Sequence, residues 1–138
     1  MRVLILCTGN SCRSQMAEGF LKHWYPNWEV FSAGTNPSIE IHPKAIKVMM
    51  EVDIDISKGF PKDVDIFKMQ SFDYVITVCN NAKENCPVFV GKVKNNVHIG
   101  FEDPAEASGT EEEIWRAFRE IRDEIYFQFD EFFKKAIK

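Results

Sequence analysis

A continuous apolar run near the start of the chain, Val3 to Leu6, most constrains the fold. A strand that is apolar at every position must be covered on both faces, as strands of parallel sheets are. The next eight residues, Cys7 to Ser14, lead into a segment in which Met16, Phe20 and Leu21 share one helical face. A buried strand followed at once by an amphipathic helix predicts an α/β protein.

The rest of the chain continues this alternation of strands and helices. Helical patterns cover residues 13–24, 42–50 and 62–69 and run onward from 110, and strand patterns cover residues 2–6, 29–31, 74–78 and 97–99. We therefore predict three layers, in which helices flank a four-stranded parallel sheet. The length of 138 residues predicts a single domain over residues 1–138.

The last helix has the clearest sequence signals. Thr110 and Glu113 have the spacing of a capping box, in which each side chain bonds a backbone amide of the other residue. We interpret the apolar stripe that follows as core and not as a cofactor-binding surface; it comprises Ile114, Phe118, Ile121, Ile125, Phe129 and Phe132.

Composition excludes several classes of protein. The net charge of −4 disfavours nucleic acid as a partner, and no apolar run approaches the ~20 residues of a membrane span. The four cysteines are too few for a disulfide scaffold and lack zinc-finger spacing. We see no secretory signal, and we expect a cytoplasmic protein without a cofactor. Nothing suggests a histidine cluster, and we expect surface or hydrogen-bonded roles for His23, His42 and His98.

The loop between the first strand and the first helix has the pattern C-x5-R-S, from Cys7 to Ser14. Such a loop can wrap a tetrahedral oxyanion with inward-facing N–H groups at the positive end of the helix. Gly9 allows a close backbone approach or a positive φ, and Arg13 can close the site with a bidentate guanidinium. The positive field and the Ser14 hydroxyl favour Cys7 as a nucleophilic thiolate. The predicted oxyanion-binding and thiolate-stabilising residues are Thr8, Gly9, Asn10, Ser11, Cys12, Arg13 and Ser14.

A general acid for this site is predicted at Asp103. This aspartate precedes Pro104 in a loop after the last strand, at the sheet edge that carries the Cys7 loop. The alternative is an aspartate that only forms an Asx-turn.

Two further cysteines, Cys79 and Cys86, follow the strand at 74–78. Three thiols near one anion site suggest disulfide exchange rather than hydrolysis. The alternative is a pair of unrelated structural thiols. We expect Cys12 to be a small loop residue without a chemical step.

These features together resemble the thioredoxin-coupled arsenate reductases of the low-molecular-weight tyrosine phosphatase fold. The pair Cys79 and Cys86 is specific to the reductases, and Ala105 stands where the phosphatases typically have an aromatic residue. The resemblance runs over most of the chain, through Cys7–Gly19, Ser32–Gly34, Asp53–Ser57, Val75–Cys79, Cys86–Pro87, Phe101–Ala105 and Gly109–Glu113.

The resemblance implies a relay of thiols. Cys7 attacks arsenate while Asp103 protonates the departing oxygen, and Cys79 then attacks the Cys7 sulfur and releases arsenite. Cys86 attacks Cys79 in turn. The segment from Cys79 to Cys86 loops out in this step and presents the Cys79–Cys86 disulfide to thioredoxin or a similar dithiol reductant. The implied partners are an arsenate-like or phosphate-like oxyanion and this reductant, and we expect a monomer.

One departure from the family concerns a cation. Family members that bind potassium are similar to this chain at Asn10, Glu18 and Ser32. They add a carboxylate at the position that is Lys62 here, with Asp63 beside it. An ammonium group can take the place of the cation, so we expect no metal ion.

Two other functions remain open from the sequence. One is a phosphotyrosine phosphatase that uses Cys7, Arg13 and Asp103, and weak phosphatase activity is expected in any case. The other is a non-enzymatic module that senses an oxyanion or the redox state of Cys79 and Cys86.

Overall fold

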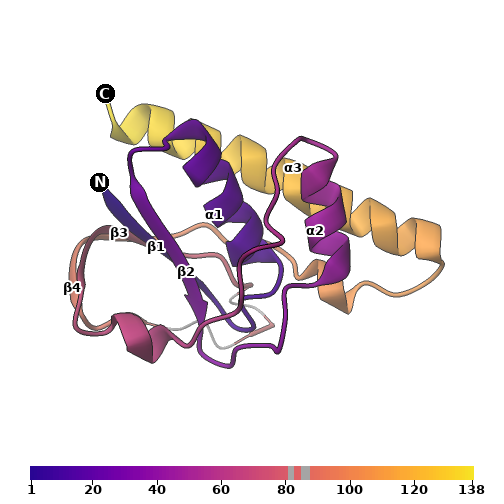
Figure 1. Cartoon of the computed structure of the whole chain (residues 1–138), viewed down its shortest axis with the longest axis horizontal. Coiled ribbons are helices and arrows are strands. Elements are labelled where there is room, and N and C mark those ends of the chain that lie inside the picture. Colours follow the sequence, from indigo (N-terminus) through magenta and orange to yellow (C-terminus); the bar gives the residue numbers. More distant parts are fainter. Residues whose placement is uncertain (81–82, 85–87) are drawn as a thin grey trace.

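A four-stranded sheet lies at the centre of the computed structural model, which describes residues 1–80, 83–84 and 88–138 (Figure 1). All neighbouring strands are parallel, in the order β2-β1-β3-β4. The four-stranded parallel sheet predicted from the sequence is therefore confirmed. Its strands are β1 (Arg2–Cys7), β2 (Glu29–Gly34), β3 (Ser71–Thr77) and β4 (Lys92–His98).

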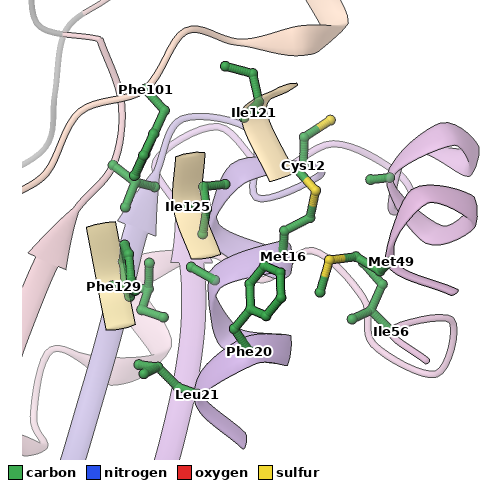
Figure 2. Close-up of a cluster of buried hydrophobic side chains, with 14 of the residues drawn as sticks. Cys12, Met16, Phe20, Leu21, Met49, Ile56, Phe101, Ile121, Ile125 and Phe129 are labelled. Carbon is green, nitrogen blue, oxygen red and sulfur yellow. The ribbon is translucent and has the colours of Figure 1, made fainter. Parts of the chain in front are cut away.

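The two faces of the sheet are covered differently. On one face, Val3 and Ile5 of β1 belong to a large core that also includes residues of all three α-helices (Figure 2). On the other face, Leu4 and Leu6 pack in a smaller cluster with Phe67 of a 3-10 helix. The helices are α1 (Arg13–Trp24), α2 (Pro43–Met50) and α3 (Glu111–Ala136), with 3-10 helices η1 (Val64–Phe67) and η2 (Pro104–Glu106).

The long helix α3 begins with the predicted capping box. The Thr110 hydroxyl accepts from the Glu113 N–H, and a Glu113 carboxylate oxygen accepts from the Thr110 N–H. The apolar stripe packs in the core as predicted, with its first and last members, Ile114 and Phe132, half-buried at the edge of the core. Phe133 beside Phe132 is fully buried, because a step of four residues from Phe129 also stays on the buried face.

The bounds of several other elements differ from the prediction. The strand β3 begins at Ser71, three residues earlier than predicted, and β4 begins five residues earlier, at Lys92. Most of β4 is exposed and polar, as edge strands often are, so its sequence lacks the apolar pattern of a strand. The helix predicted over residues 62–69 is only the single turn of η1.

Among the helices of the described residues, none has the length and apolarity needed to cross a membrane.

Candidate active site

The loop from Cys7 to Arg13 joins the carboxyl end of β1 to the first turn of α1. Three of its carbonyl oxygens point away from the loop's interior. The oxygens of Thr8, Gly9 and Ser11 accept hydrogen bonds from the N–H groups of residues 36, 38 and 42. This outward arrangement leaves the loop amides free to face the interior. Among the described residues no side chain caps α1, so its positive end also faces the loop. We call residues 7–13 the cradle.

Three residues, two in the cradle and one in β2, give the cradle its backbone shape. Asn10 has a φ of 53°, so the positive φ falls on an asparagine and not on a glycine. Gly9 serves for close approach, since a Cβ there would lie 2.9 Å from the Ser38 Oγ. Gly34 of β2 is more restrictive, because a Cβ on it would lie 2.3 Å from the Thr8 carbonyl oxygen. Only glycine lets β2 pass so close to the cradle.

The Cys7 sulfur is buried and surrounded by hydrogen-bonding groups. The Asn10 N–H donates to it over 3.2 Å, and the Ser14 Oγ lies 3.0 Å away. The Asn10 Nδ2 donates to the same Ser14 oxygen over 2.7 Å. With its oxygen already accepting from Asn10, Ser14 can turn its own proton toward Cys7. These contacts suit a thiolate at Cys7.

Arg13 is 3% exposed and lies at the mouth of the cradle. Its Nη1 donates to the Phe101 carbonyl oxygen over 3.2 Å, and its Nη2 lies 3.6 Å from the Asp103 Oδ2. The Nε is buried and has no hydrogen-bond partner among the described residues. A bound oxyanion would satisfy this remaining donor.

Asp103 faces the cradle from the turn that follows β4. Its Oδ1 accepts from the Ala105 N–H over 3.0 Å, so it forms the Asx-turn weighed from the sequence. The same turn aims Oδ2 toward Arg13, so the two readings of Asp103 are compatible.

Glu84 is the site residue that the sequence analysis missed. Its two carboxylate oxygens accept from Nη1 and Nη2 of Arg13, over 2.5 Å and 2.8 Å. Thr8 Oγ1 and the Asn80 N–H also donate to it. The Arg13 guanidinium, together with the Asn80 and Thr8 hydrogen bonds, lowers the pKa of Glu84 to about 2 against the effect of burial. A glutamate in a polar loop has no sequence signal that marks such a contact.

The cysteines differ in state and setting. Cys79 is buried and disulfide-bonded, whereas Cys7 and Cys12 are free thiols. Thr77 pairs with Leu6 and the Val78 N–H donates to the Leu6 carbonyl, so Cys79 follows β3 at the level of the cradle. Cys86 lies outside the described residues, so its predicted role stays a prediction.

Cys12 lies in the main core beside Met16 (Figure 2). Burial raises the pKa of its thiol to about 12. A thiol that stays protonated suits the packing role expected from the sequence.

The groups considered for potassium suit a cation poorly. Asn10 Oδ1 already accepts from the Lys62 N–H and from Gln15 Nε2, and the Ser32 hydroxyl donates to Glu18. The Lys62 ammonium donates to a backbone carbonyl over 2.8 Å, and burial lowers its pKa while Glu18 raises it. The described residues hold no group of three His, Cys, Asp or Glu side chains arranged for a metal. We therefore derive no step through a metal ion.

A cavity of about 720 Å³ brings residues 7–13 together with Glu84 and Asp103. These lining residues come from segments that lie as far apart in the sequence as residues 7 and 103. The arrangement combines a nucleophile, inward-facing amides, one buried guanidinium and a carboxyl group within one opening. It can bind a tetrahedral oxyanion, attack its central atom and protonate a departing oxygen.

Comparison with known proteins assigns the fold and site to a family. The family model described as low molecular weight phosphotyrosine protein phosphatase matches residues 2–138. The chain belongs to this family. The match includes the cradle, Cys79 and Asp103, so the site lies within the family's own domain.

Similar members of the family are named arsenate reductases. The arsenate reductase of Oceanobacillus iheyensis is 50% identical over 127 residues, which are 89% of this chain and 88% of that protein. The solved structure of an arsenate reductase in the phosphate binding state superposes with a TM-score of 0.81 at 32% identity, covering 97% of both chains. A thioredoxin-dependent arsenate reductase of Corynebacterium glutamicum superposes with a TM-score of 0.62 at 32% identity, covering 94% of this chain and 60% of that one.

Proposed function

We propose that this protein is an arsenate reductase that thioredoxin recycles. The observation that carries the proposal is the disulfide-bonded Cys79 at the same sheet edge as the Cys7 cradle. A phosphatase needs only the cradle, Arg13 and an acid, whereas a reductase also needs thiols that supply two electrons. The arsenate reductase relatives support the same conclusion.

In the proposed reaction, arsenate binds in the cradle and the Cys7 thiolate attacks arsenic. Asp103 gives its proton to the departing oxygen, which leaves as water. The Cys79 thiolate then attacks the Cys7 sulfur, and the electron pair of the broken sulfur–arsenic bond stays on arsenic, which leaves as arsenite. Arsenic gains two electrons, and the two thiols become one disulfide.

The last steps restore the nucleophile. Cys86 attacks Cys79 and frees the Cys7 thiolate, and a dithiol such as thioredoxin then reduces the Cys79–Cys86 disulfide. We also propose that residues 1–138 form one catalytic domain that acts as a cytoplasmic monomer. A weak phosphatase side activity is included, because phosphate and arsenate share charge and shape.

Thioredoxin-dependent arsenite release tests the function, and cysteine variants test the relay. We expect Cys7→Ser to abolish both reduction and phosphatase activity, since a serine hydroxyl is a much poorer nucleophile. Cys79→Ser is expected to keep phosphatase activity but lose reduction. Cys86→Ser is expected to stop after about one turnover with a Cys7–Cys79 disulfide, which mass spectrometry of the alkylated protein detects.

Two results would refute these assignments. Sustained thioredoxin-driven turnover in Cys79→Ser would exclude the relay. No arsenite release from the parent protein, with phosphatase activity retained, would make the protein a phosphatase.

A further inference from the structure

The Arg13–Glu84 contact lies where the proposed function needs Arg13 to bind the substrate. We propose that Glu84 competes with the substrate oxyanion for Arg13 while Cys79 is disulfide-bonded, so that tight oxyanion binding requires this carboxylate to leave. The competition between Glu84 and an oxyanion for Arg13 does not depend on the reaction that the protein catalyses. Its control by the Cys79 disulfide rests on the proposed function.

The geometry of the contact is that of a bound anion. Each oxygen of Glu84 accepts from a different terminal nitrogen of Arg13, which is the paired arrangement that a guanidinium offers to an oxyanion. Thr8 Oγ1, a side chain of the cradle, donates to Oε1 over 3.0 Å. Donors of the substrate site therefore bind a carboxylate of the chain itself.

Charge makes simultaneous binding unfavourable. Glu84 is a carboxylate at pH 7, Arg13 lowers its pKa further, and Asp103 lies 3.6 Å from the same guanidinium. An oxyanion would bring one or two further negative charges beside Glu84, in a site screened less than open solvent. Arg13 is 3% exposed, so it cannot turn into water to serve a second anion without losing its buried contacts.

The backbone beside the disulfide holds Glu84 in place. The Asn80 N–H donates to Glu84 Oε2 over 2.8 Å, and the Asn80 carbonyl accepts from the N–H groups of Lys83 and Glu84. Asn80 directly follows the disulfide-bonded Cys79. Breaking the disulfide therefore changes the restraint on the backbone of Asn80, which positions the Glu84 carboxylate. We infer that reduction of Cys79 releases Glu84 from Arg13.

This competition would have a use in the reaction cycle. When arsenate has been reduced and Cys79 is oxidised, Glu84 moves onto Arg13 and disfavours the bound arsenite. It also keeps a second arsenate away from a Cys7 that has no reduced thiol to complete the reaction. Thioredoxin would then restore the thiols and the oxyanion site in one step.

Titration calorimetry with inorganic phosphate at pH 7 tests the competition in the disulfide-bonded protein. We expect Glu84→Gln to bind phosphate roughly 10-fold to 100-fold more tightly than the parent, the range of a charge-assisted hydrogen-bonded pair. Glu102→Gln is the matched control, because Glu102 lines the same cavity but pairs with the exposed Lys83. It removes the same charge without touching Arg13, and its effect is expected to be about fivefold or less.

The same titration after reduction with dithiothreitol tests the link to the disulfide. We expect the parent to bind phosphate more tightly after reduction, so that the difference in phosphate affinity between the parent and Glu84→Gln disappears. Equal or weaker phosphate binding by oxidised Glu84→Gln would overturn the competition and make Glu84 a residue that orients Arg13. A gap that survives reduction would overturn the link to Cys79. Phosphate binding does not require arsenate reduction, so failure of the proposed function would leave a distinct result.

Discussion

Replacing Asp103 by asparagine removes the proposed proton donor while changing the structure little. The Oδ1 acceptor that bonds the Ala105 N–H is retained in asparagine. The lost contact is the 3.6 Å approach of Oδ2 to Arg13 Nη2, which lies beyond hydrogen-bonding distance on a side chain that is 26% exposed. Such a pair contributes about 1 kcal/mol or less, so the variant should fold normally.

The chemical step, by contrast, should be much slower. A positioned general acid contributes roughly 10²-fold to 10⁴-fold to a rate, and we expect turnover in arsenate reduction to fall by that factor. Phosphate affinity should change little, because Asp103 makes no contact that the oxyanion needs. The assay is thioredoxin-dependent arsenite release at saturating arsenate, with Glu102→Gln as the neighbouring control.

A second readout separates proton donation from positioning. In the phosphatase side reaction, phenyl phosphate has a poorer leaving group than p-nitrophenyl phosphate and depends more on protonation. The Asp103→Asn variant should therefore lose more activity on phenyl phosphate. Parent-like turnover, or equal losses on both esters, would remove Asp103 from the role of acid.

Three further outcomes are expected. Cys12→Ser should leave turnover nearly unchanged but lower the free energy of unfolding by about 1 kcal/mol in a urea titration, because it buries a hydroxyl in the core. Potassium should change activity and melting temperature no more than sodium at equal ionic strength, since Lys62 stands where a carboxylate ligand is expected and the Asn10 and Ser32 side chains are already hydrogen-bonded; a gain specific to potassium would contradict this. The pKa of Glu84 is about 2 in the fold against a usual 4.5, so its ion pair stabilises the fold above about pH 4.5 and is lost as pH falls toward 2. The disulfide-bonded parent should exceed Glu84→Gln in stability by on the order of 1–2 kcal/mol at pH 6 and by much less at pH 2, whereas a difference independent of pH would contradict the ion pair.

The cradle could be predicted from sequence because its parts are local. Residues 7–14 are contiguous, and the strand before them and the helix after them fix the loop at both ends. Asp103 could also be predicted, since the carboxyl ends of parallel strands meet at one edge of the sheet.

The contacts that complete the site are not local. The bonds from residues 35–42 to the cradle carbonyls depend on how the chain continues beyond β2. Glu84 lies 71 residues from Arg13 in sequence, and nothing in the intervening sequence marks the pair. The length of β4 is underestimated from the sequence for a related reason, because an edge strand needs no apolar residues on its exposed side.

The charges around Arg13 suggest an order for the reaction. This one buried guanidinium lies beside Cys7, Asp103 and Glu84, so a bound oxyanion would be a fourth acidic group at a single positive charge. Of the three groups, Glu84 occupies both terminal nitrogens of Arg13, so it is the group that an incoming oxyanion has to replace. The proposed reaction gives steps to Asp103 and Cys7 but none to Glu84. Binding would thus favour the protein in which Glu84 has left Arg13, and this departure would come before the attack on arsenic.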